Sequence, residues 1–218
     1  MAYTLKINES YIKSTALDIT GIVDEYLRRT DVEENELIIY SDNKYRSRGP
    51  LLDLSVIESK YTVIELTGIS PYNIEGLHDS VSVLDIDEGS EYVDAAVILD
   101  SLPTDNMTEL SLTYYRLVGT IPPTIEDFSL LLVLDLSRNE LKGILSIYLP
   151  NLRELYLDYN MIEAIADPFY DMDSLEILSM KYNRLRRDPT SRLNEMQNLH
   201  TVELQGNPFS RRRSVINA

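Results

Sequence analysis

The chain has 218 residues, of which 44% are apolar, and a formal net charge of −16 at neutral pH. It contains no cysteine and only two histidines, so disulfides are excluded and a zinc site is nearly excluded. The acidic excess disfavours direct nucleic-acid binding, because the phosphates would be repelled. No apolar run reaches the roughly 18 residues that a membrane span requires. We expect no cofactor, no small-molecule substrate and no contact with a membrane.

Residues 1–33 have the pattern of an N-terminal cap. Tyr3, Leu5 and Ile7 alternate as in a strand, and apolar residues then recur at helical spacing over about residues 10–29. We expect this helix to cover the first part of the core, the alternative being a helix that binds a partner. The N-terminus has no uninterrupted apolar stretch typical of a secretory signal, and cysteine is absent, so we expect a cytoplasmic protein.

Residues 34–209 repeat one pattern, weakly at first and clearly from residue 131 onward. The clear copies are Leu131, Leu134, Leu136, Asn139 and Leu141; Leu152, Leu155, Leu157, Asn160 and Ile162; Leu175, Leu178, Met180, Asn183 and Leu185; and Leu199, Val202, Leu204, Asn207 and Phe209. The asparagines recur at intervals of about 20 to 25 residues. The weak copies contain Leu37 and Ile39, Ile64 and Leu66, Leu84 and Ile86, and Leu110 and Leu112, with Asp42, Ile69, Gly89 and Tyr115 in place of asparagine.

The spacing has a physical explanation. Side chains of a strand alternate between its two faces, so the fourth and sixth positions of each copy point inward and the third, fifth and seventh point outward. One such coil cannot bury its apolar side chains alone, whereas stacked coils share a continuous core. The asparagine follows the strand, where its amide can satisfy backbone groups that the tight bend buries.

The repeat resembles the leucine-rich-repeat family, and Leu117-Val-Gly-Thr-Ile-Pro122, partly echoed at Leu141-Lys-Gly143, resembles the plant-type subclass. The resemblance implies an α/β solenoid with a concave parallel β-sheet, about eight coils and an N-terminal helical cap. We expect one domain over residues 1–218, with the cap at 1–33, the repeats at 34–209 and a basic tail at 210–218. The insert at residues 91–106 is expected to form a short helix on the convex side.

Projection of the repeat onto the sheet gives a candidate partner-binding face. Tyr114, Tyr159 and Tyr182 share the eighth position of their copies, and tyrosine and arginine are enriched where proteins bind one another. The alternative is that tyrosine simply suits an exposed strand position. The candidate residues are Tyr114, Arg138, Asp135, Tyr156, Asp158, Tyr159, Lys181, Tyr182, Glu203, Arg211, Arg212 and Arg213.

The last three of these candidates lie in the basic tail. We expect the final strand, around residues 199–205, to have a neighbour on one side only, and such edges are prone to association. Arg211, Arg212 and Arg213 would then reach acidic groups of a partner or of a second copy, which would give self-association through the C-terminal edge.

Catalytic motifs are absent, since no nucleophile elbow, phosphate loop or metal-ligand cluster occurs and His78 and His200 are isolated. We therefore predict a non-enzymatic adaptor or regulator that binds a protein partner, with a basic or mixed surface, on its concave face. The alternatives are a structural subunit of a larger cytoskeletal or ribonucleoprotein assembly, or an effector of a pathogen or symbiont.

Overall fold

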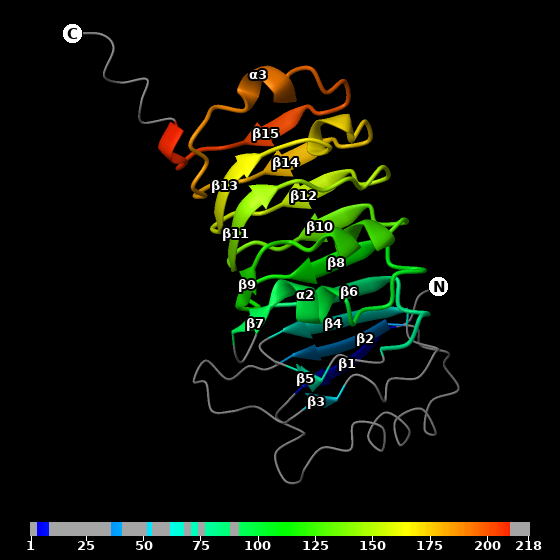
Figure 1. Ribbon diagram of the computed structural model, residues 1–218. Coiled ribbons are helices and arrows are strands. Elements are labelled where there is room, and N and C mark those ends of the chain that lie inside the picture. Colours follow the sequence, from blue (N-terminus) through cyan, green and yellow to red (C-terminus); the bar gives the residue numbers. More distant parts are fainter. Residues whose placement is uncertain are drawn as a thin grey trace, which may run out of the picture.

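The computed structural model describes residues 4–8, 36–40, 52–53, 62–67, 71–73, 77–87 and 92–209. These residues form parallel strands that lie one above another, from β1 near the bottom of Figure 1 to β15 near its top. The helix predicted over residues 10–29 and the basic tail at 210–218 lie outside the described residues. Those two predictions therefore stay predictions.

The main sheet contains nine strands in the described part of the chain, and every neighbouring pair in it is parallel. Their order follows the sequence: β1 (Thr4–Asn8), β2 (Glu36–Tyr40), β4 (Val63–Thr67), β6 (Val83–Ile86), β8 (Glu109–Leu112), β10 (Val133–Asp135), β12 (Glu154–Tyr156), β14 (Ile177–Ser179) and β15 (Thr201–Glu203). The predicted parallel sheet of an α/β repeat fold is therefore present.

Strand register agrees with the frame taken from the sequence, including its weak copies. Equivalent apolar positions pair from strand to strand: Leu37 with Ile64, Ile64 with Leu84, Leu84 with Leu110, Leu110 with Leu134, Leu134 with Leu155, Leu155 with Leu178, and Leu178 with Val202. Strand β1, which the sequence assigned to the cap, pairs with β2 and so continues the same sheet. The number of coils remains an expectation.

The inward positions form one apolar core. Leu134, Leu155 and Leu178 are completely buried, and so are the first leucines of their copies, Leu131, Leu152 and Leu175. Leucine→alanine changes at such sites cost about 2–5 kcal/mol, because they leave a cavity. The last copy departs from the expectation: Val202 is 38% exposed, since β15 has a neighbouring strand on one side only within the described residues.

The segments between the strands form the opposite side of the molecule. They contain a second parallel sheet in the order β13 (Met161–Ile165), β11 (Glu140–Leu145), β9 (Leu117–Gly119), β7 (Val93–Asp94). Short helical turns complete this side: α2 (Ala95–Leu99), η3 (Pro123–Asp127), η4 (Phe169–Asp171) and α3 (Thr190–Leu193). A small pair, β3 (Leu52–Asp53) and β5 (Pro71–Asn73), is separate.

Helix α2 confirms the helix predicted in the insert at residues 91–106. The Asp94 side chain caps it by accepting a hydrogen bond from the Ala96 N–H at 3.0 Å. The helix contacts β7, β9 and η3, which places it on the side away from the main sheet.

The asparagine side chains form hydrogen bonds with the backbone N–H and carbonyl groups that the tight bends bury, as predicted from the sequence. In the example of Asn160, Oδ1 accepts from the Leu141 N–H at 2.9 Å and Nδ2 donates to the Leu136 carbonyl at 2.9 Å, both in the preceding coil. Asn139, Asn183 and Asn207 make the equivalent pair of bonds. We call this series the asparagine ladder. It holds the backbone of adjacent coils at a fixed distance.

Candidate partner-binding face

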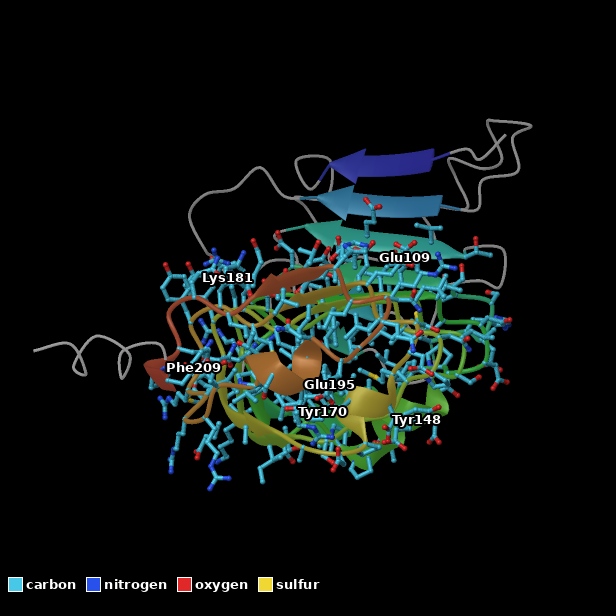
Figure 2. The ribbon with its side chains drawn as sticks, turned by 90° about the horizontal axis from the view of Figure 1, so that it is seen from above. Glu109, Tyr148, Tyr170, Lys181, Glu195 and Phe209 are labelled. Carbon is cyan, nitrogen blue, oxygen red and sulfur yellow. The ribbon has the colours of Figure 1, made fainter. Side chains whose placement is uncertain are left out.

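The outward face of the main sheet carries the side chains that follow the buried leucines. Figure 2 looks down the stack of coils and shows Glu109 and Lys181 on the sheet side, with Tyr148 and Tyr170 on the opposite side. The main-sheet strands of the clear repeats are only three residues long. The seventh and eighth positions therefore lie just beyond the strands, at the carboxyl edge of the sheet.

The eighth position has an unusual backbone. Tyr114, Arg138, Tyr159 and Tyr182 have φ values of 52°, 60°, 54° and 54°, and Gly206 completes the column with φ 83°. This left-handed conformation suits glycine and asparagine and is costly for bulky residues. The idea that these tyrosines occupy exposed strand positions is therefore wrong, because each lies in the turn after a strand.

The side chains of this column form one continuous stack, which we call the aromatic ladder (Tyr114, Arg138, Tyr159 and Tyr182). The Arg138 guanidinium lies over the Tyr114 ring at 5.0 Å and over the Tyr159 ring at 4.5 Å. The Tyr159 and Tyr182 rings stack with centroids 4.6 Å apart and an interplanar angle of 15°. The electron-rich ring faces attract the guanidinium, and the two stacked rings attract one another through dispersion and the burial of apolar surface.

The side chains of the aromatic ladder are exposed to solvent and are also held in place by contacts with one another. Tyr114, Tyr159 and Tyr182 are 49%, 42% and 51% exposed. At its C-terminal end the Tyr182 ring lies directly over Gly206, since a Cβ atom at that glycine would be 2.5 Å from Tyr182 Cδ1. A large accessible surface is thus held in one conformation by contacts within the chain.

A polar cluster lies beside the aromatic ladder, formed by Asp158, Ser179, Lys181 and Glu203. Lys181 Nζ is 3.2 Å from Asp158 Oδ2 and 2.5 Å from Glu203 Oε2. The Ser179 hydroxyl donates to Asp158 Oδ1 at 2.6 Å, and the Lys181 backbone N–H donates to the same oxygen at 2.8 Å. Three of the predicted residues are therefore brought together here, and they neutralise one another in part.

The shifts in pKa agree with this pairing. Hydrogen bonds to Glu203 and Asp158 raise the pKa of the Lys181 ammonium, and the hydrogen bond from Lys181 lowers the pKa of Glu203. The charged forms of both side chains are thus favoured. Ser179 was not among the predicted binding residues, although its fifth position places it on this face, where it is buried among these charges on β14.

Asp135 stands in a different environment. Burial raises the pKa of its carboxyl, the Ser137 hydrogen bonds oppose that rise, and the charges of Asp158 and Asp85 add to it. Among the described residues, Asp135 has no cation within ion-pair distance. Within the described residues, the sheet face therefore has a carboxylate without a counter-charge.

Tyr156 packs between these groups on β12. Its hydroxyl donates to Glu154 Oε2 at 2.7 Å, and burial, together with that bond to Glu154, raises the pKa of Tyr156 to about 12. The phenol stays protonated at any physiological pH. Glu154 was absent from the predicted set, although its outward third position could have identified it.

Of the predicted binding residues, the described part of the chain thus brings together two groups. The aromatic ladder contains Tyr114, Arg138, Tyr159 and Tyr182, and the face beside it contains Asp135, Tyr156, Asp158, Lys181 and Glu203. Arg211, Arg212 and Arg213 lie outside the described residues, so the docking role predicted for them remains a prediction.

Within the described residues, no group of three or more His, Cys, Asp or Glu side chains is arranged to hold a metal ion. No helix in that same part of the chain has the length and apolar character to cross a membrane.

Comparison with known proteins gives two findings. Residues 105–162 match the family model described as leucine rich repeat. A stretch of 106 residues, 47% of the chain, is 30% identical to Toll-like receptor 2 of Bison bison, of Bubalus bubalis and of Bos taurus. The matched stretch covers only 12% of the length of each of these receptors.

Proposed function

Because the chain is a leucine-rich-repeat protein, we propose that it is a non-enzymatic adaptor or regulator that binds a protein partner on its concave face. Domains of this family generally mediate recognition between proteins. The finer proposal concerns the place of binding, which is the aromatic ladder and the sheet face beside it. A cytoplasmic location stays a prediction from the sequence.

The aromatic ladder carries this proposal. Three tyrosines and an arginine are kept in a backbone conformation that disfavours them, on an exposed edge where the last coil has glycine. Their mutual stacking fixes the rotamers before a partner arrives, so less side-chain freedom is lost on binding. Tyrosine and arginine are also the residue types that dominate binding energies at protein interfaces.

Charge on the sheet face suggests the kind of partner. Asp135 has no counter-charge among the described residues, and Glu109 and Glu154 are further outward carboxylates on β8 and β12. A partner segment with lysine or arginine side chains would relieve this repulsion and would be attracted over a distance. We infer a partner surface that is basic or of mixed charge.

The test replaces Tyr114, Tyr159 and Tyr182 together with asparagine, which tolerates the left-handed conformation. The readout is the set of proteins cross-linked to the full chain in cells that make it, compared with the wild type by quantitative mass spectrometry. We expect capture of the main partner to fall at least about 30-fold, which corresponds to ~2 kcal/mol.

Tyr148 provides the matched control. Its exposed fraction of 39% is similar to that of the three tyrosines of the aromatic ladder, but it lies on the opposite side of the molecule. Tyr148→Asn should leave capture unchanged, and circular dichroism should show that both variants are folded. Undiminished capture by the folded triple variant would place binding on another surface and would refute the proposal.

A further inference from the structure

Arg138 differs from the other members of the aromatic ladder because it is charged and both faces of its guanidinium are covered. The ring centroids of Tyr114 and Tyr159 lie 5.0 Å and 4.5 Å from it. The planar group is thus held between two aromatic faces, while the residue as a whole remains exposed. In this arrangement the N–H donors at the edge of the guanidinium are the part left for hydrogen bonding.

Those donors have no acceptor in the described part of the chain. Arg138 makes no side-chain hydrogen bond and no ion pair with any described residue, and its contacts are the two rings. One carboxylate on the next coil belongs to Asp158, whose backbone carbonyl accepts a hydrogen bond from the Arg138 backbone N–H at 2.7 Å. The Asp158 carboxylate, however, is already engaged by Lys181 and Ser179.

A guanidinium with covered faces and free edges is suited to a planar anion. Arginine binds a carboxylate through two parallel N–H···O bonds in one plane, and this geometry needs the orientation that the two rings impose. Since the rings fix that orientation in advance, binding an anion costs less conformational freedom than it costs a free arginine.

We propose that Arg138 is the carboxylate-binding residue of the partner-binding face, and that it takes the side chain of an aspartate or glutamate of the protein partner. This inference rests on the proposed function. A doubly charged phosphate is the less suitable ligand, because the surrounding face is acidic and repels it more strongly. The partner segment then has one carboxylate for Arg138 among basic residues that face Asp135 and its neighbours.

Arg138 can be tested without the partner, by nuclear magnetic resonance of the arginine Nε–H groups of the full chain. Sodium acetate is the probe, and sodium chloride at equal ionic strength is the blank. Arg187 is the matched control, since it is exposed and has neither a ring contact nor an ion pair within the described residues. We expect acetate to bind Arg138 at least about fivefold more tightly than Arg187.

Replacing Tyr114 and Tyr159 together with leucine removes both covering rings and keeps Arg138. In that variant the acetate affinity of Arg138 should fall to that of Arg187. Equal affinities in the wild type, or an unchanged Arg138 affinity in the leucine variant, would overturn the inference. Inorganic phosphate serves as the second probe, and tighter binding of phosphate than of acetate would overturn the assignment to a carboxylate.

The two proposals fail in different measurements. If acetate does not select Arg138 but partner capture still depends on the tyrosines, the recognition face stands and Arg138 merely stacks within it. If acetate selects Arg138 but capture is indifferent to the tyrosines, the anion site exists and the partner binds elsewhere.

Discussion

The turn that follows β8 and the turns that follow β10, β12, β14 and β15 do the same task with different chemistry. In the later turns an asparagine fills the bend and bridges to the backbone of the preceding coil. In the earlier turn Tyr115 occupies that place and is buried, but its hydroxyl makes no hydrogen bond with any described residue. The bend therefore tolerates a side chain that only fills space, provided that the next asparagine, Asn139, reaches back to it through the Leu117 N–H and the Leu112 carbonyl.

Charge on the outward face divides the molecule in a similar way. On β12 to β15 the carboxylates of Asp158 and Glu203 share Lys181, whereas Asp135 on β10 has no such cation in the described part. Within the described residues, Asp158 and Glu203 are thus neutralised in part by Lys181, whereas Asp135 is left for a cation of another molecule. Four stability measurements test these differences between the coils.

The largest effect is expected from Asn160→Ala. It removes the acceptor for the Leu141 N–H and the donor to the Leu136 carbonyl, both buried, and should lower the free energy of unfolding by about 2–4 kcal/mol. Urea unfolding measures this loss. Asn151 is the control, since its exposed side chain donates to the Ser129 carbonyl at a similar 2.8 Å, and Asn151→Ala should cost less than ~1 kcal/mol. Equal losses would show that the ladder bonds have no special weight.

Gly206→Ala should cost about 1–2 kcal/mol, because it combines a left-handed backbone with a clash against the Tyr182 ring. Gly143→Ala provides the control: its φ of 86° is similar, but its nearest contact is Thr120 Cγ2 at 3.1 Å. The excess cost at Gly206 should disappear in a Tyr182→Ala background, which a double-mutant cycle measures. If Gly206→Ala still costs more than Gly143→Ala in the Tyr182→Ala background, the additional cost does not come from a clash with the Tyr182 ring.

Asp135→Asn should stabilise the protein by a smaller amount at neutral pH. The folded state raises the pKa of this carboxyl, so its ionisation costs stability once the pH exceeds the ordinary value of 3.8. The gain should shrink as the pH falls through the raised pKa and vanish below 3.8, where Asp135 is protonated in both states. Unfolding of both variants across acidic and neutral pH tests this, and a gain that is constant with pH would contradict it.

Tyr115→Phe should have the smallest effect at neutral pH, a change of less than about 1 kcal/mol, because the hydroxyl has no described partner to lose. At alkaline pH the variant should gain an advantage. Burial raises the pKa of Tyr115 from 10.0 to about 12, so the wild type loses stability as the pH rises above 10.0 and its unfolded chain ionises. Thermal unfolding at neutral and alkaline pH compares the two. A large loss of stability in Tyr115→Phe at neutral pH would show that the Tyr115 hydroxyl does make a stabilising hydrogen bond.

Much of the fold can be predicted from the sequence, because the spacing of the apolar residues in each repeat also determines which side chains are buried. The alternation of Leu134 and Leu136 with Val133 and Asp135 allows only one face to be buried, and the parallel register then aligns each copy with the next. The exposure of Val202 could not be predicted in this way, because the repeat pattern shows which positions face the core and does not show whether another coil covers them.

The sequence predicts which residues of the candidate site share a position in successive coils, but it does not predict the contacts between their side chains. Repeat spacing places Tyr159 and Tyr182 at the same position of adjacent coils. The left-handed turn that brings their rings into a stack is a property of the backbone, and the identity of those two residues does not indicate it. Gly206 in the same column was the available signal, since glycine favours positive φ. Burial of Ser179 depends on the rotamers of Asp158 and Glu203, which no periodicity encodes.

The asparagine bonds give the molecule a polarity along the chain. Asn207 completes the turn at Leu185, Asn183 completes the one at Ile162, and in each case the later coil supplies the side chain and the earlier coil the backbone. Unfolding that starts from the C-terminal side therefore removes the bridge to buried backbone groups of the preceding coil each time a coil with an asparagine is lost. Fraying from the other side releases only an amide side chain, which water can solvate. Among the coils that contain an asparagine, unfolding from the C-terminal side should therefore cost more than unfolding from the N-terminal side.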